Sequence, residues 1–264
     1  ETASEASQVS WLVNFLNALL SAGCILFLFW SITRLVRSLI INEEQNLSTM
    51  DVIVILGSGF VGALAYTFSD TFWFSAVEGE VYAFSSFLTA LVFWMILRWQ
   101  DESDSVYGDR WIILIAYIIG LSIGVHLLNL LCIPAIVLVF YYQKYHAISF
   151  KGVAAAIVIS GLLIVFILFV YIPGIADMGG WFELLFVNVF GLPFHTGLIV
   201  FLALTFLVLV GAIYRFRKRM LHTSLWCLLM LTVGYTTYAV ILIRANANTP
   251  LNENAPDNIF TLKS

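Results

Sequence analysis

Two carboxylates, Glu78 and Glu80, lie between long apolar runs in the segment FSAVEGEVYAFSS. A carboxylate in such surroundings can act as a general base, taking the proton of a hydroxyl group as that oxygen attacks a reaction centre. On a helix the two side chains would point in different directions, because residues two apart do not share a face. The alternative is that one acid, Glu80, begins the next helix and is favoured there by the helix dipole. We interpret Glu80, with Glu78 second, as the catalytic candidate, and the nearby Trp73 as a substrate contact.

Two further segments carry polar groups that could bind a substrate. His126 and Asn129 lie in GLSIGVHLLNLLCIP, and Arg244 and Asn246 begin RANANTPLNENAPDN. The guanidinium fork of an arginine pairs well with phosphate oxygens, although an arginine at the end of a span can also simply reach back to the interface. We interpret these four residues as substrate-binding candidates. The sequence shows no metal-ligand spacing and no paired cysteines, so we expect neither a metal nor another cofactor.

The composition identifies the environment of these groups. Hydrophobic residues make up 61% of the 264 residues and charged residues only 11%, whereas a soluble domain has about 25% charged residues. Such a chain cannot cover a surface that faces water. The sequence therefore predicts an integral membrane protein.

Six apolar segments have the length of a membrane span: Trp11–Thr33, Val52–Ser69, Val81–Leu97, Gly152–Ile172, Phe194–Tyr214 and His222–Ile243. A seventh, Trp111–Tyr142, carries no formal charge and is too long for one span, and Gly120, Gly124 and Pro134 interrupt it. We expect a tight helical hairpin here, which brings the total to about eight transmembrane helices.

The basic residues favour the hairpin, because lysine and arginine gather on the cytoplasmic side of a membrane. With the hairpin, all but two of them share one side: Arg34, Arg37, Arg98, Arg110, Lys144, Lys151, Arg215, Arg217, Lys218 and Arg219 inside, and Arg244 and Lys263 outside. A single crossing would instead divide them evenly. In the favoured topology every candidate residue named above lies on the outer side.

Several glycines and polar residues have simpler interpretations. Gly57, Gly59 and Gly62 match the spacing of a dinucleotide fingerprint, but small residues in a span usually allow close helix packing. Asn14, Asn17 and Ser21 recur at helical spacing in the first span and are typical of hydrogen bonding between helices. We therefore assign none of these residues to catalysis.

The stretch between Pro173 and Pro193 is expected to be an outer loop, with Glu183 in it and His195 beside it. Its apolar part is too short to cross, so we expect a helix lying in the interface, or a re-entrant one, with Trp181 as an anchor.

The segments DTFWFSAVEGEVYAFSSFLTALVFWMILRW, GLSIGVHLLNLLCIPA and RANANTPLNENAPDN resemble a bacterial multi-span domain-of-unknown-function family. That family is similar to the protein O-mannosyltransferases and, more broadly, to the GT-C glycosyltransferases. The resemblance implies a GT-C-like fold, an extracytoplasmic active site and a polyprenyl-phosphate sugar donor. It also implies that Glu80 is the acid at the end of the family's second outer loop. His126 would match the polar residue at the outer end of the family's short pair of helices, and Arg244 would lie where a ligand of the donor phosphate is expected. The family's first acidic loop would precede Glu1, so we expect the chain to be an N-terminally incomplete part of a longer protein, and its activity by itself stays open.

These observations together predict an all-α polytopic membrane protein, with a transmembrane domain over residues 1–243 and the start of an extracytoplasmic region over residues 244–264. The expected activity is inverting transfer of mannose or another hexose from a polyprenyl phosphate to a protein or glycan hydroxyl, in the bacterial inner membrane and without nucleic acid. A secondary transporter or flippase and a non-catalytic membrane scaffold are the alternatives. Transporters place ionisable groups near the bilayer midplane, whereas we expect every charged residue here at a span end or in a loop.

Overall fold

The computed structural model describes residues 6–40, 47–105, 107–145, 147–247, 252 and 254–262. These residues form helices and loops and contain no strand, which confirms the predicted all-α polytopic membrane fold. Within them, seven helical runs are long and apolar enough to cross a membrane: Gln8–Ile40, Thr49–Thr67, Tyr82–Glu102, Leu127–Lys144, Phe150–Val189, Thr196–Arg215 and Arg219–Asn246. Helix α5 (Asp109–Ile123) has 15 residues and is not among these seven, whereas the sequence predicted about eight.

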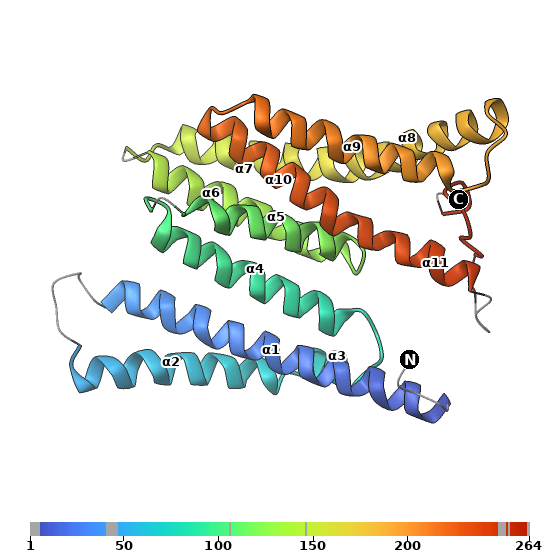
Figure 1. The fold of residues 1–264 in the computed structure, drawn as a ribbon. Coiled ribbons are helices and arrows are strands. Elements are labelled where there is room, and N and C mark those ends of the chain that lie inside the picture. Colours follow the sequence, from blue (N-terminus) through green and yellow to red (C-terminus); the bar gives the residue numbers. More distant parts are fainter. Residues whose placement is uncertain are drawn as a thin grey trace. The chain divides into compact units, whose positions relative to one another are not determined.

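The chain divides into two compact units, one made of residues 1–115 and 125–135 and the other of residues 116–124 and 136–264. In the first unit, α1 (Ala6–Ile40) packs against both α2 (Thr49–Thr67) and α4 (Tyr82–Glu102), and the short α3 (Asp70–Val77) also contacts α1 (Figure 1). The 3₁₀ helix η1 (Leu127–Cys132) packs against α4. Helix α1 therefore holds this unit together.

The glycines of α2 bring it close to α1. A Cβ atom on Gly59 would clash with the side chain of Thr33, and one on Gly62 would lie 2.6 Å from Ile32 Cδ1, whereas Gly57 has open space around it. Helices approach closely where small residues meet a neighbour. This confirms helix packing, and not dinucleotide binding, as the role of Gly59 and Gly62.

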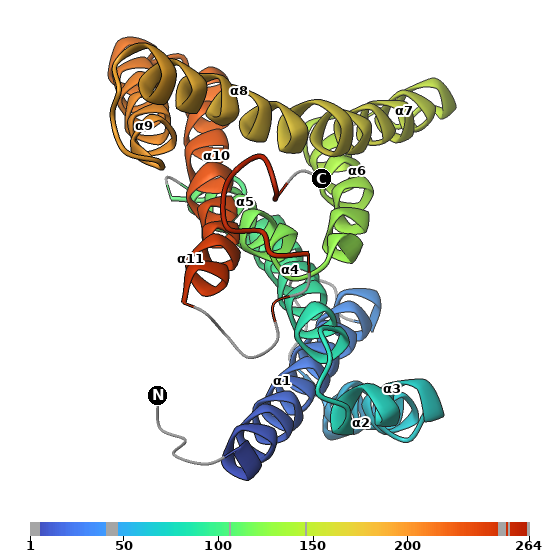
Figure 2. The same cartoon turned by 90° about the vertical axis from the view of Figure 1, so that its right-hand side faces the viewer.

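The second unit contains the longest helical run of the described residues. The helices of this unit are the end of α5 (from Ala116 on), α6 (Ile133–Lys144, from Ile136 on), α7 (Phe150–Phe166), the π-helical η2 (Ile167–Tyr171), α8 (Ile172–Leu184), the π-helical η3 (Leu185–Val189), α9 (Thr196–Arg215), α10 (Arg219–Tyr235), the 3₁₀ helix η4 (Thr236–Ala239) and α11 (Val240–Asn246). Helix α9 lies beside α8 and α10 in both views (Figure 2). Helices α5 and α10 meet where Gly120 faces the backbone of Leu231 and Gly234 faces that of Tyr117.

The predicted break in the uncharged run is confirmed. Helix α5 ends at Ile123, and η1 begins at Leu127 and continues into α6. His126 between them has extended backbone angles (φ −164°, ψ 142°), so the chain is not helical at that point. The uncharged run thus forms two helices, as its length and breakers indicated.

The prediction that the chain leaves the helix at Pro173 is wrong, because the chain stays helical from Phe150 to Val189, whereas a helix was predicted in the apolar part of this stretch and is present. A proline inside a helix removes one hydrogen bond and its ring clashes with the carbonyl group four residues earlier. The π-helical segment η2 ends just before Pro173, which takes an early position of α8. The wider turn accommodates the proline without ending the run. Glu183 therefore lies in a helix.

Residues 248–251, 253, 263 and 264 of the predicted region 244–264, including Lys263, lie outside the described residues. Residues 254–262 fold back within the second unit, where Ile259 and Phe260 lie against Gly179 and Gly180 of α8.

Candidate functional site

The two carboxylates lie in the short connection between α3 and α4. Both side chains are exposed, and the Glu80 N–H donates to the Glu78 carbonyl oxygen at 2.9 Å. Helix α4 begins at Tyr82 and has no acidic residue in its first turn, so the prediction that Glu80 begins this helix is wrong by two residues. Because the helix dipole acts mainly within the first turn, the interpretation of Glu80 as a dipole-stabilised helix start loses its main support.

Asn17 of α1 holds this connection in place. Its side chain is only 5% exposed, and its amide donates to the carbonyl oxygens of Glu78 and Glu80, the latter at 3.4 Å. Between them Gly79 lies close to α1, since a Cβ there would be 3.2 Å from Val13 Cγ1. The predicted hydrogen bonding between helices is not what Asn17 does, since its partners lie in this connection, and the Ser21 hydroxyl has no partner among the described residues. The Asn17 contacts give a fixed backbone that leaves both carboxylates free in solvent.

His126 lies beside the start of α4. Its imidazole ring is 5.7 Å from the Tyr82 ring, centroid to centroid, and Tyr82 is only two residues from Glu80. The His126 Nδ1 atom accepts the Leu128 N–H at 3.1 Å and caps η1. An imidazole that accepts at Nδ1 and is neutral carries its proton at Nε2. The structure therefore brings the hairpin tip next to the segment after Glu80, with an N–H left to donate.

Asn129 has a different environment from the one expected at a hairpin tip. It is fully buried in η1, and neither its Nδ2 nor its Oδ1 atom has a hydrogen-bond partner among the described residues.

Trp73, the other predicted substrate contact in this unit, is 53% exposed. Its ring stacks on that of Phe68 at 6.3 Å, while its neighbour Phe72 is buried against Tyr66. Trp73 thus lies on the outward surface of α3.

Arg244 and Asn246 belong to the second unit. The Asn246 amide donates to the carbonyl oxygens of Leu242 at 2.9 Å and Asp257 at 2.7 Å, which uses both of its hydrogens to fix the fold. Arg244 is exposed in the last turn of α11 and forms no ion pair within the described part of the chain. Arg244 and Glu80 belong to different units. That they lie together in one active site stays a prediction.

Glu183 of α8 is a buried structural acid. Only 2% of it is exposed, and its carboxylate accepts the N–H groups of His195 and Leu198, the latter at 2.9 Å. These N–H groups lie at the start of α9, where a negative charge is favoured. His195 has a left-handed backbone (φ 71°) at this turn. The carboxylate therefore fixes the turn between η3 and α9.

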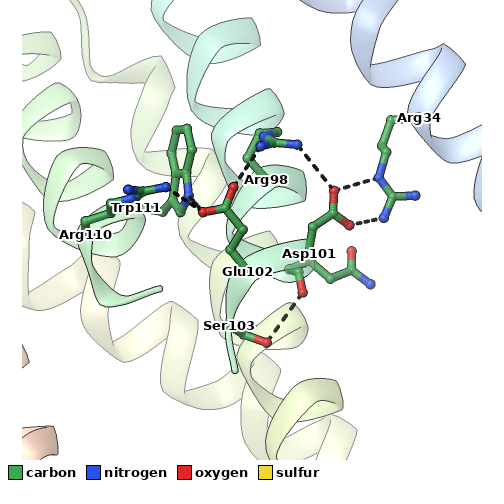
Figure 3. Close-up of polar contacts among 8 residues, drawn as sticks. Arg34, Arg98, Asp101, Glu102, Ser103, Arg110 and Trp111 are labelled. Carbon is green, nitrogen blue, oxygen red and sulfur yellow. Dashed lines mark hydrogen bonds and ion pairs between the residues drawn. The ribbon is translucent and has the colours of Figure 1, made fainter. Parts of the chain in front are cut away.

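The far end of α4 carries an ionic network that the sequence analysis overlooked (Figure 3). Arg34 Nε of α1 lies 2.8 Å from Asp101 Oδ2, and Glu102 binds Arg98 and Arg110 at 2.7 Å each. The Trp111 indole N–H also donates to Glu102. The sequence signal was that Arg98 precedes Asp101 by three residues and Glu102 by four, because side chains at these spacings are neighbours on a helix. The network joins α1, α4 and α5 about 30 Å along α4 from Glu80, so it supports the fold and is too distant to join the chemistry at Glu80.

A cavity of about 330 Å³ lies within the first unit. Its walls come from α1, α2, α4 and η1: Cys24, Leu28, Ser31, Tyr66, Ser86, Thr89, Ala90, Phe93 and Leu128. In the described residues no group of three His, Cys, Asp or Glu side chains is arranged to hold a metal ion.

A sequence model of one protein family matches residues 2–149, and its description is Protein O-mannosyl-transferase TMEM260 N-terminal domain. The match covers more than half of the chain and includes Glu78, Glu80, His126 and Asn129. No curated protein and no solved structure matches the chain.

Proposed function

Because the chain belongs to the family of the protein O-mannosyl-transferase TMEM260 N-terminal domain, we propose that it transfers a hexose, with mannose as first choice, to a hydroxyl group of a protein or glycan. The donor in this proposal is a polyprenyl-phosphate sugar, because the candidate residues lie at span ends, where a lipid-borne substrate arrives. The charge count of the loops supports an extracytoplasmic reaction, and the family resemblance supports a GT-C-like fold in a bacterial inner membrane.

The proposed reaction is a single displacement at the anomeric carbon. The acceptor oxygen forms a bond to that carbon while the bond from the carbon to the phosphate oxygen breaks, which inverts the configuration. The acceptor's proton passes to a carboxylate, and the polyprenyl phosphate leaves with the bonding electron pair. A general base of this kind raises the rate by roughly 10²- to 10⁴-fold.

Glu80 is the proposed base. The observation that carries this assignment is the Asn17 contact, because it fixes the backbone on both sides of Gly79 while the carboxylates stay exposed. Glu80 is favoured over Glu78 because it is nearer to Tyr82, which lies against His126. A base must be held in position and reach its substrate, and this connection offers both.

The proposed phosphate ligands are donors of hydrogen bonds. Arg244 offers an exposed guanidinium group, and His126 offers an Nε2–H, because its Nδ1 is engaged with Leu128. Donors aimed at the departing phosphate stabilise the charge that develops on it. Asn246 is not needed in this role, since two carbonyl oxygens already occupy its amide hydrogens.

The experiment compares Glu80→Gln with Glu78→Gln in a transfer assay on purified full-length protein. Glutamine keeps the size of the side chain and removes the base. We expect Glu80→Gln to lower kcat on the order of 10²- to 10⁴-fold and Glu78→Gln to cost far less, with thermal midpoints unchanged for both.

Three outcomes would contradict the assignment. If Glu78→Gln is the inactive variant, the wrong carboxylate was chosen. If both variants turn over normally, neither is the base. If the midpoint of Glu80→Gln drops along with its rate, the loss reflects folding and not proton transfer.

A further inference from the structure

The buried amide of Asn129 is the strongest sign of an additional binding function. An asparagine amide carries two donor hydrogens and a carbonyl acceptor. Asn129 is 0% exposed, and both polar atoms lack a partner in the part of the chain that the structure describes. Burial without a partner is unfavourable for an amide, so a group that can both donate to it and accept from it would bind there.

The position of Asn129 on η1 shows which surface it faces. In a 3₁₀ helix, residues three apart lie on one face, so His126, Asn129 and Cys132 share a face. Both ends of this face contact α4, since His126 lies against Tyr82 and Cys132 Sγ is 4.0 Å from the Thr89 carbonyl oxygen. Asn129 is midway between these contacts and therefore faces the part of α4 between Tyr82 and Thr89.

Ser85 lies on the facing stretch of α4. It is 1% exposed, and its hydroxyl group also has no partner among the described residues. It follows Tyr82 by three residues and precedes Thr89 by four, so it lies on the same side of α4 as both. The seam between η1 and α4 thus contains two buried polar side chains without partners.

Space for a ligand adjoins this seam. The walls of the cavity of about 330 Å³ include Ser86 and Leu128, the immediate sequence neighbours of Ser85 and Asn129. Its volume lies within the range of about 300–1,000 Å³ that is usual for small-molecule pockets. The wall of this cavity is mostly apolar, and it also includes Ser31, whose buried hydroxyl has no partner in the described residues.

The charges in this region favour a neutral ligand. Asp70, Glu78 and Glu80 surround this end of α4. The four arginines of the unit, Arg34, Arg37, Arg98 and Arg110, are at or near the opposite helix ends, and its sequence has no lysine. A hydroxyl group both donates and accepts and adds no charge, so a neutral sugar fits a seam whose nearest charged residues are acidic.

We propose that Asn129 and Ser85 bind hydroxyl groups of the sugar that is transferred, and that the seam between η1 and α4 opens to admit them. This proposal rests on the proposed function and adds a sugar-recognition site to it. Segment η1 is suited to the movement, because 3₁₀ helices of this length are uncommon and their hydrogen bonds are poorly aligned.

The test uses Asn129→Leu in full-length protein, because leucine has a similar size and removes the buried amide. Two ligands are compared by equilibrium titration: polyprenyl-phosphate mannose and the same polyprenyl phosphate without its sugar. We expect the Kd of the mannosylated lipid to rise about 10- to 100-fold while that of the bare lipid phosphate stays unchanged. Ser85→Ala should act in the same direction with a smaller effect.

Thermal stability separates this role from a structural one. Asn129→Leu should melt at the wild-type temperature or above it, since replacing an unpaired amide by an apolar group relieves the cost of burial. The matched control is Asn17→Leu, which removes a paired amide and should melt at a lower temperature.

The outcomes distinguish this inference from the proposed function. Equal weakening of both lipids, an unchanged Kd for the mannosylated lipid, or a large drop in the melting temperature of Asn129→Leu would overturn the sugar site and leave the transferase proposal intact. If wild-type protein binds neither lipid, the lipid-linked donor is wrong, and the sugar site proposed here falls with it.

Discussion

Replacing Asn17 by alanine tests whether α1 positions the carboxylates. The substitution removes an amide that donates to the Glu78 and Glu80 carbonyl oxygens, one of them at a long 3.4 Å. A typical hydrogen bond contributes about 0.5–1.5 kcal/mol to stability, and the long one counts for less. Because the residues that carry these carbonyl groups are exposed, water can replace part of the loss. We therefore expect Asn17→Ala to lower the free energy of unfolding by about 1–2 kcal/mol.

The effect on turnover should exceed the effect on stability. A misplacement of about 1 Å at a reacting group can cost on the order of 10²-fold in rate, and Asn17→Ala frees the backbone on both sides of Gly79. The assay measures kcat at saturating donor lipid, together with denaturant unfolding of the same preparation. Asn17→Asp keeps the shape but sets carboxylate oxygens against carbonyl oxygens, so it should be worse than alanine.

Asn14→Ala is the matched control, because Asn14 is exposed on α1 one turn before Asn17. Exposed substitutions usually change stability by less than about 0.5 kcal/mol. Equal losses in the Asn14 and Asn17 variants would refute the reasoning. Wild-type behaviour of Asn17→Asp would refute it as well, since that variant cannot donate to either carbonyl oxygen.

Three further predictions concern packing, phosphate binding and topology. Gly234→Ala should lower the melting temperature, with a cost of about 1–3 kcal/mol, because its Cβ would clash with the backbone of α5. Gly211→Ala is the control, because a Cβ atom there would have nothing within 4 Å, and it should be neutral or slightly stabilising. The same melting temperature for both variants would contradict the close contact between Gly234 and α5. Arg244→Lys keeps the charge but loses the two-pronged contact with phosphate, so the KM for donor lipid should rise without a change in melting temperature. If the KM is unaltered in this variant and also in Arg244→Ala, the residue only anchors the span. In a protein without its native cysteines, Leu127→Cys should react with a membrane-impermeant thiol reagent added to intact cells, and Tyr145→Cys should not. Labelling of Tyr145→Cys alone would overturn the predicted orientation of the hairpin.

Features that follow from hydrophobicity and local chemistry could be predicted from the sequence. The hairpin of α5 and α6 is one of them, because the length of the uncharged run, its breakers and the distribution of arginine and lysine all indicate two helices. The break around Gly79 is a second, since adjacent acids and glycine disfavour a continuous apolar helix. Such patterns depend on residues close in sequence or on the membrane itself.

Features that depend on contacts between distant residues could not be predicted. Nothing in the local sequence shows that Asn129 is buried without a partner or that Glu102 binds Arg110 and Trp111. Pro173 is the clearest error, because its usual effect is to end a helix, and only the preceding π-helical turn allows the run to continue.

The continuous helix from Phe150 to Val189 has a mechanical consequence for the bilayer. Its 40 residues span about 60 Å at 1.5 Å per residue, twice the hydrocarbon thickness of about 30 Å. An upright run of this length would project far beyond the hydrocarbon layer, so we expect a large part of it to lie at a shallow angle in the interface. Trp181, which is 77% exposed in that part, would then wedge between the lipids of a single leaflet. A wedge in one leaflet widens that leaflet relative to the other, so the protein's conformation is coupled to the lateral tension and curvature of its membrane.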